Sequence, residues 1–232
     1  MARILDAQVH SDDRRTDGGW GYYFADGHVW DRDRWPRASV TSWQLMALES
    51  ARLGGLEVPS AVFRDAGVFL AGTWDSSRGA FRYSHDPSRL NSGYPILPAS
   101  TPATMFGLSL LGLDLGSDQF VAARRYVLER APDRYREASE SQFVFEAKGN
   151  LYFWYYGTLA MFRAGGDAWQ RWNVAMKDTL LDSQSEDGSW RPISTYADYA
   201  GDDARDKSYT TALNVLTLEV YYRYFTPLLE VR

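Results

Sequence analysis

Two short acidic stretches carry the side chains best suited to acid–base chemistry. WDRDRW spans residues 30 to 35, and GDDARDKS spans residues 201 to 208. Paired carboxylates can act as acid and base in glycoside hydrolysis or a lyase reaction, or bind calcium if other oxygen ligands converge on them. Each stretch is also typical of a charged loop, in which solvent or neighbouring arginines balance the acids. The candidate catalytic residues are Asp31, Asp33, Asp202 and Asp203.

Aromatic residues offer a second kind of site. Trp, Tyr and Phe make up 15% of the chain, and several of them crowd the starts of predicted helices. If those starts meet at one mouth, the rings line a cavity suited to an isoprenoid tail or to sugar rings; if they point between helices, they are core. The candidate ligand-binding residues are Trp43, Tyr152, Trp154, Tyr155 and Tyr209.

Composition excludes several other classes of site. The chain has no cysteine, and its three histidines, His10, His28 and His85, have no metal-ligand spacing, so neither a metal nor a cofactor is expected. A net charge of −5 without a basic stripe argues against nucleic acid as a partner. No apolar run approaches the roughly 20 residues of a membrane span. Nothing in the sequence indicates a compartment.

The elements that would position these residues are helices. Each of the four strongly apolar segments is too long for a typical strand, and its apolar residues wrap most of a helical circumference. They are residues 38–53, 99–113, 151–164 and 208–225. Narrower amphipathic segments lie between them, at 59–72, 117–131 and 167–184. This alternation predicts an all-α fold of stacked helix pairs, with no strand pair beyond short extended pieces such as QFVF at 142–145.

One phrase occurs twice. LDSQSEDGSW at 181–190 is echoed by LDAQVHSDDRRTDGGW at 5–20, so that each copy has a glutamine, a polar spacer, and then Asp-Gly-small-Trp. The amide can tie the loop or an orphan backbone group at a helix end, the glycine turns the chain, and the indole packs under the next helix. The phrase therefore predicts a clasp between neighbouring helices, with a stabilising role and no catalytic one.

These residues resemble a known superfamily. QSEDGSW matches the Gln-x-x-x-Gly-x-Trp clasp of squalene and oxidosqualene cyclase repeats, and most of the chain resembles bacterial prenyltransferase and squalene-oxidase repeat proteins. The resemblance implies an α/α toroid, with inner helices ringing an axial cavity and outer helices around them. Four inner and three outer helices would make an incomplete ring, so we expect residues 1–232 to be a single toroid-like domain of a longer chain truncated on the N-terminal side. Otherwise a second copy closes the ring.

The catalytic groups of that superfamily are missing from the positions where the resemblance would put them. Class II terpene cyclases place an Asp-x-Asp-Asp motif at the start of an inner helix, but residues 37–40 and 207–210 read RASV and KSYT. Protein prenyltransferases hold zinc partly through cysteine, which is absent. We therefore predict a non-catalytic ligand-binding or interaction module. The alternative is an enzyme that acts on an isoprenoid or carbohydrate, as a lyase, hydrolase or cyclase. An aspartate at the bottom of a closed apolar pocket would favour this alternative.

Overall fold

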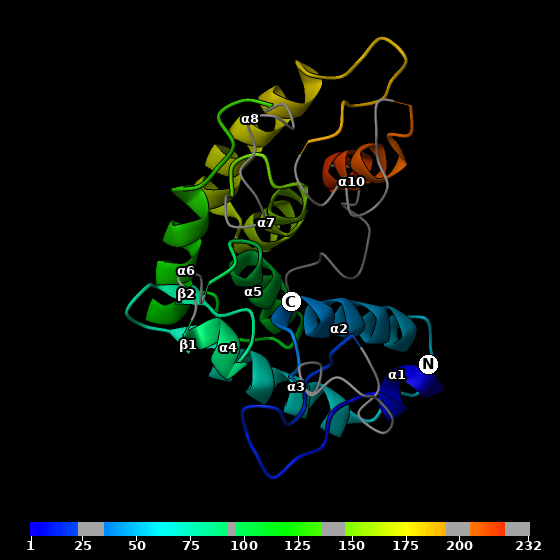
Figure 1. The fold of residues 1–232 in the computed structure, drawn as a ribbon, viewed down its shortest axis with the longest axis vertical. Coiled ribbons are helices and arrows are strands. Elements are labelled where there is room, and N and C mark those ends of the chain that lie inside the picture. The colour runs from blue at the N-terminus through cyan, green and yellow to red at the C-terminus, as the bar shows by residue number, and fades with distance from the viewer. Residues whose placement is uncertain (23–34, 92–95, 136–146, 194–204, 221–232) are drawn as a thin grey trace.

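The apolar and amphipathic segments form helices, so the chain is mainly helical, as the sequence predicts (Figure 1). This computed structural model describes residues 1–22, 35–91, 96–135, 147–193 and 205–220. The helices in these ranges are α1 Ala2–Asp6, α2 Ala38–Leu53, α3 Ser60–Gly72, α4 Pro87–Leu90, α5 Ser100–Leu110, α6 Asp118–Leu128, α7 Leu151–Ala164, α8 Gly166–Leu181 and α10 Ser208–Glu219. The predicted limits of α2 and α7 are confirmed to the residue. The predicted piece 142–145 lies outside the described residues.

A short strand pair is a feature that the sequence did not predict. Strand β1, Trp74–Asp75, pairs antiparallel with β2, Ala80–Phe81, and Trp74 lies opposite Phe81. Gly79 turns the chain between them with a φ of 60°, a value that suits glycine. Asp75 accepts hydrogen bonds from the backbone and hydroxyl of Ser77, at 3.1 and 2.6 Å. Two-residue strands are too short for an alternating pattern to reveal.

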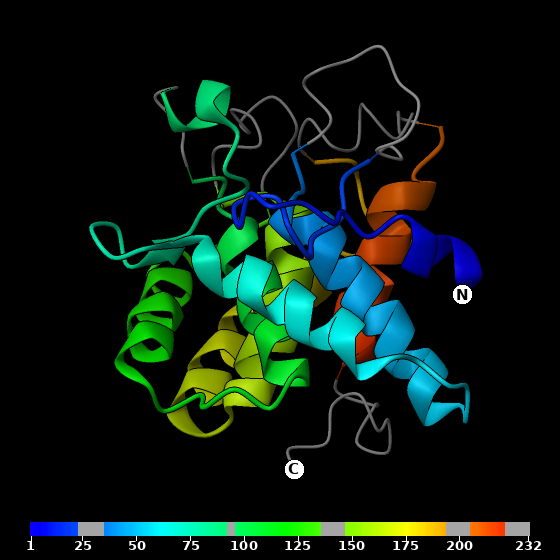
Figure 2. The same ribbon diagram turned by 90° about the horizontal axis from the view of Figure 1, so that it is seen from below.

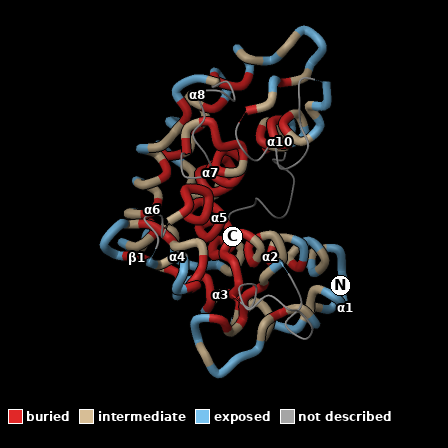
Figure 3. The backbone as a smooth tube through the Cα atoms, in the orientation of Figure 1, coloured by how far each residue is buried: buried red, intermediate tan, exposed pale blue. Residues whose placement is uncertain are grey.

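The long helices form two layers. Helices α2, α5, α7 and α10 form one row, in which each helix packs against the next. Helices α3, α6 and α8 form a second layer along one side of this row (Figure 1). The view in Figure 2 shows α2 and α10 starting on the same side of the molecule. Every residue from Ser100 to Ser109 of α5 is buried, whereas α8 buries one face, including Trp172 and Met176 (Figure 3). The predicted alternation of buried and half-exposed helices is confirmed from α5 to α8. Helices α2 and α10, which the sequence predicted to be buried on more than one side, each bury only one face.

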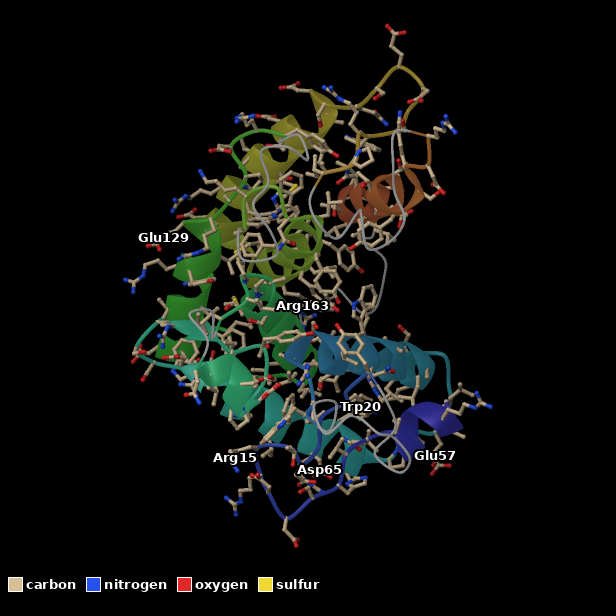
Figure 4. The ribbon with its side chains drawn as sticks, viewed as in Figure 1. Arg15, Trp20, Glu57, Asp65, Glu129 and Arg163 are labelled. Atoms are coloured by element: carbon tan, nitrogen blue, oxygen red, sulfur yellow. The ribbon has the colours of Figure 1, made fainter. Side chains whose placement is uncertain are left out.

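The first copy of the repeated phrase fastens α1 to α2. Gln8 donates from Nε2 to the carbonyl of Gly18 at 2.8 Å, and Gly18 has a φ of 84°. Trp20, labelled in Figure 4, donates from Nε1 to the carbonyl of Ile4 at 2.7 Å. Its backbone N–H donates to Thr41 Oγ1 in α2 at 3.0 Å. The phrase thus joins the end of one helix to the first turn of the next.

The second copy repeats these three hydrogen bonds, while a further bond from Gln8 Nε2 to Val62 O, at 3.0 Å, belongs to the first copy. Gln184 Nε2 donates to Gly188 O at 2.8 Å, and Trp190 Nε1 donates to Leu180 O at 2.9 Å. The backbone N–H of Trp190 donates to Thr211 Oγ1 in α10 at 3.4 Å. Both copies place the glycine at the turn and the indole under the preceding helix end. The predicted clasp is confirmed in both places, except that each indole bonds to the end of the preceding helix, whereas the sequence predicted that it packs under the next one.

Candidate functional site

A pocket opens where the buried helices begin. Its volume is about 310 Å³. Five aromatic residues line it: Tyr22, Trp43, Tyr83, Tyr152 and Tyr209. The remaining described lining is apolar or carries a small hydroxyl, from Ser39, Val40, Leu97, Ala99 and Ser100. The volume lies at the small end of the range for ligand sites, and the aromatic walls are typical of them.

The pocket gathers the first turns of four helices. Ser39, Ser100, Tyr152 and Tyr209 are each the first or second residue of their helix, in α2, α5, α7 and α10 respectively. These helices therefore all direct their N-termini at the same hollow. Each helix N-terminus carries a partial positive charge of about +0.5 from its unpaired N–H groups. Backbone N–H groups left free at these helix starts are therefore expected to favour a negative group in the pocket, whose described lining contains no ionised side chain.

Trp43 is the centre of an aromatic cluster behind the pocket. Its indole stacks on Tyr155, with centroids 5.7 Å apart and planes 17° apart, and meets the edge of Tyr156 at 5.6 Å. Its Nε1 donates a hydrogen bond to the hydroxyl of Tyr152. The rings of Tyr152 and Tyr156 also pack edge to face, 5.2 Å apart. One side of the indole is thus held by core rings, which fixes the orientation of the wall that Trp43 contributes.

The predicted ligand-binding residues divide into two groups. Trp43, Tyr152 and Tyr209 line the pocket, whereas Trp154 and Tyr155 do not. Trp154 is 1% exposed and packs on Tyr135 at 5.9 Å, and Tyr155 is 2% exposed and supports Trp43 from behind. Because α7 is buried around most of its circumference, crowding at its start could not indicate which rings reach the pocket.

Two lining residues were missed by the sequence reasoning. Tyr22 and Tyr83 come from segments outside the long helices, and their hydroxyl oxygens lie 3.0 Å apart. Tyr22 belongs to the aromatic stretch GGWGYYFADG, which the sequence assigned to a loop clasp. The carbonyl of Tyr83 accepts from the N–H of Ala38 at 2.8 Å, and this bond brings Tyr83 to the start of α2. No pattern in the sequence marks that contact.

Charge lies beside the pocket in a buried pair. Arg37, the residue before α2, places its guanidinium 5.6 Å from the centroid of the Tyr83 ring. Its Nη2 is 3.9 Å from Oδ2 of Asp86, and about nine-tenths of each side chain is buried. No Asp, Glu, His, Lys or Arg belongs to the pocket lining that the structure describes. The predicted catalytic residues Asp31, Asp33, Asp202 and Asp203 lie outside the described ranges.

The tyrosine hydroxyls of the cluster are held in the protonated form. Burial raises the pKa of Tyr152 above its usual value, against the opposing effect of the Trp43 hydrogen bond. Burial also raises the pKa of Tyr156 well above its usual value, and the neighbouring tyrosines add to the shift. Desolvation penalises the phenolate in both cases. These groups can donate and accept hydrogen bonds, but they supply no base near neutral pH.

Two other hollows lie on the outer layer. One, of about 740 Å³, is polar and includes Asp178, Asp182 and Arg191. The other, of about 400 Å³, is an apolar groove between α3 and the segment at Leu111 and Leu113. Within the described ranges, no group of three or more His, Asp and Glu side chains is placed to hold a metal. None of the described helices combines the length and apolarity needed to cross a bilayer.

No known protein family matches this chain, and no curated protein and no solved structure matches it either. The chemistry of the aromatic pocket therefore has to be argued from its own residues.

Proposed function

We propose that this chain is an incomplete α/α toroid-like domain that binds a small apolar ligand in the aromatic pocket and does not transform it. The observation that carries the proposal is the pocket itself. Aromatic rings from three of the long helices, Trp43, Tyr152 and Tyr209, line it, and its described lining contains no carboxylate or imidazole that could act as acid or base. A site of this kind supplies shape and apolar contact rather than proton transfer.

The arrangement of the helices supports the toroid-like part of the proposal. Helices α5 to α8 alternate between buried and half-exposed, and α2, α5, α7 and α10 all begin at one hollow. That is the relation expected between inner helices and an axial cavity. Closure of the ring by a second copy or by further chain stays a prediction. So does the alternative in which Asp31, Asp33, Asp202 or Asp203 catalyses a reaction on the ligand.

An isoprenoid fits this pocket better than a carbohydrate. A sugar ring presents several hydroxyl groups, each of which costs free energy when buried without a hydrogen-bond partner. Most hydroxyl groups of the described lining are already engaged. The Ser100 hydroxyl lies 2.7 Å from Phe81 O and 2.6 Å from Leu97 O. The hydroxyls of Tyr22 and Tyr83 lie 3.0 Å from each other, and that of Tyr152 accepts from Trp43. Val40, Leu97 and Ala99 instead provide an apolar surface. A branched alcohol or acid of about ten carbons suits a site at the small end of the usual volume range.

The proposal is tested with geraniol and cellobiose as paired probes. Geraniol is expected to bind and to change tryptophan fluorescence, while cellobiose does not bind. Trp43→Ala removes the central wall and should weaken geraniol binding about 10- to 100-fold, from ~1.5–3 kcal/mol of lost apolar contact. Trp169→Ala is the matched control, since Trp169 of α8 is also half-buried but packs on Phe162, near the end of α7, and is not part of the pocket lining.

Three results would contradict the proposed function. If geraniol does not bind, the aromatic pocket is not a geraniol-binding site. The same conclusion follows if geraniol binds equally well to wild type and to Trp43→Ala while Trp169→Ala weakens its binding. Mass spectrometry of geraniol after prolonged incubation with the protein tests the non-catalytic part. Recovery of unchanged geraniol is expected, and a product that forms only in the presence of protein supports the enzymatic alternative.

A further inference from the structure

We propose that the natural ligand of the aromatic pocket ends in a carboxylate, which the first turn of α2 binds. This inference rests on the proposed function, because it concerns the head group of a ligand whose tail the aromatic walls hold. It starts from three hydrogen-bond donors that the fold brings to the pocket and leaves unused.

Two of these donors are backbone N–H groups. Arg37 precedes α2, and no side chain caps this helix start. The N–H of Ala38 donates to Tyr83 O at 2.8 Å and that of Thr41 to Arg37 O at 2.9 Å. The N–H groups of Ser39 and Val40, in between, have no partner among the described residues. Both residues line the pocket.

The third donor is the hydroxyl of Ser39. Ser39 is 6% exposed, and within the described ranges its side chain makes no hydrogen bond. It lies four residues before Trp43, so the two side chains share one face of α2, and both line the pocket. This hydroxyl belongs to the pocket lining, so its hydrogen-bond partner must come from solvent or from a ligand. An acceptor oxygen on a ligand would provide one for Ser39 and for both N–H groups.

The sign of the local potential selects an anion. Four helix N-termini meet at the pocket, and partial positive charge at such ends favours negative groups and disfavours cations. The guanidinium of Arg37 stands behind Tyr83, but Asp86 lies 3.9 Å from it and balances most of its charge. A ligand cation such as a quaternary ammonium, which aromatic rings alone would suit, is opposed by this field.

The size of the potential selects a single charge. A diphosphate is normally held by several lysine or arginine side chains with charge-assisted hydrogen bonds. None lines the described part of the pocket. A carboxylate needs less: its two oxygens can accept from the N–H groups of Ser39 and Val40 and from the Ser39 hydroxyl. Its apolar tail would then extend along Trp43, in the direction of Tyr152 and Tyr209.

The test compares three probes that share one tail: geranic acid, geraniol and methyl geranate. Binding to the full 232-residue chain is measured by titration calorimetry at pH 7.5. The acid is expected to bind about tenfold more tightly than the alcohol or the ester. Ser39→Asp places a negative charge at the proposed head-group position and should abolish this preference for the acid. Ser39→Ala, which removes one donor of three, should reduce the preference only in part.

Ser60→Asp is the matched control. Ser60 is the exposed first residue of α3, so the substitution adds the same charge to the first turn of another helix outside the pocket lining. It should leave the preference for the acid intact. An acid in a first turn favours the helix, so both Asp variants are expected to fold, which circular dichroism verifies.

The outcomes separate this inference from the proposed function. Equal binding of acid, alcohol and ester to wild type overturns the carboxylate assignment and leaves the apolar site standing. A preference for the acid that survives Ser39→Asp also overturns it, since the head group would then bind elsewhere. If none of the three probes binds, the proposed function fails together with the inference.

Discussion

The packing of α7 against α8 depends on a glycine beneath a tryptophan ring. A Cβ atom at position 157 would lie 2.4 Å from two ring atoms of Trp172, Cη2 and Cζ2. Trp172 is fully buried, and its Nε1 donates to Thr158 Oγ1 at 2.9 Å. Gly157→Ala therefore forces either the indole or the backbone of α7 to move. Because Tyr156 is the preceding residue, the change reaches the support of the pocket as well.

The magnitude follows from three contributions. Overpacking of a filled core typically destabilises a protein by ~1–3 kcal/mol. Weakening of the hydrogen bond between Trp172 and Thr158 adds ~0.5–1.5 kcal/mol. The better helix propensity of alanine offsets ~1 kcal/mol of this loss. The net expectation is a decrease of ~2 kcal/mol in the free energy of unfolding, or a fall in Tm of roughly 4–8 °C for a chain of this length.

Urea unfolding and thermal melts followed by circular dichroism measure this change. Gly72→Ala is the control, because Gly72 is also a glycine within a helix, at the end of α3. A Cβ atom added there would have His85 Nε2 as its nearest neighbour, at an ordinary contact distance of 3.8 Å. That variant should be as stable as wild type or slightly more stable. A Gly157→Ala protein with unchanged or increased stability would refute the close approach of Trp172 to α7.

Two further predictions concern a clasp and a buried acid. Trp190→Phe removes the indole donor to the Leu180 carbonyl, which still accepts from Ser183, so we expect a loss of ~0.5–1.5 kcal/mol in urea unfolding. A variant as stable as wild type would show that the clasp hydrogen bond adds nothing. Burial opposes ionisation of Asp75, but hydrogen bonds from Ser77 and Arg78 outweigh this effect and lower the pKa of the carboxyl group. The ionised carboxylate therefore stabilises the fold above about pH 4, and this stabilisation is lost as the pH falls through the lowered pKa. Asp75→Asn should therefore be less stable than wild type at pH 7, with a difference that shrinks below pH ~4 in melts run across that range; a constant difference would contradict the assignment.

The helices could be predicted because their signals are local. In α7 apolar residues cover the circumference, Asn150 caps the start by accepting from the N–H of Phe153 at 2.9 Å, and Gly165 ends the helix with a φ of 65°. The same local character made the clasps recognisable. In each copy the glutamine, the glycine and the tryptophan lie close together in the sequence, so their spacing indicates that these groups can contact one another.

The pocket could be predicted only in outline. Crowding of aromatic residues at helix starts marked Trp43, Tyr152 and Tyr209, but it marked Trp154 equally, which lies in the core. A helix buried on all sides has no apolar stripe that would orient it, so the sequence does not distinguish its faces. Tyr83 reaches the site through one backbone hydrogen bond to α2, a contact that no spacing rule could foresee.

The sequence by itself thus determined the helices, the alternation between buried and half-exposed helices from α5 to α8, and the clasps, because each depends on residues close together in the chain. Tertiary structure alone decided that the starts of α2, α5, α7 and α10 meet at one hollow, and that Ser39 and Val40 bring unused donors to it. The lining residues of that hollow run from Tyr22 to Tyr209, and packing between helices, rather than spacing along the chain, sets their distances.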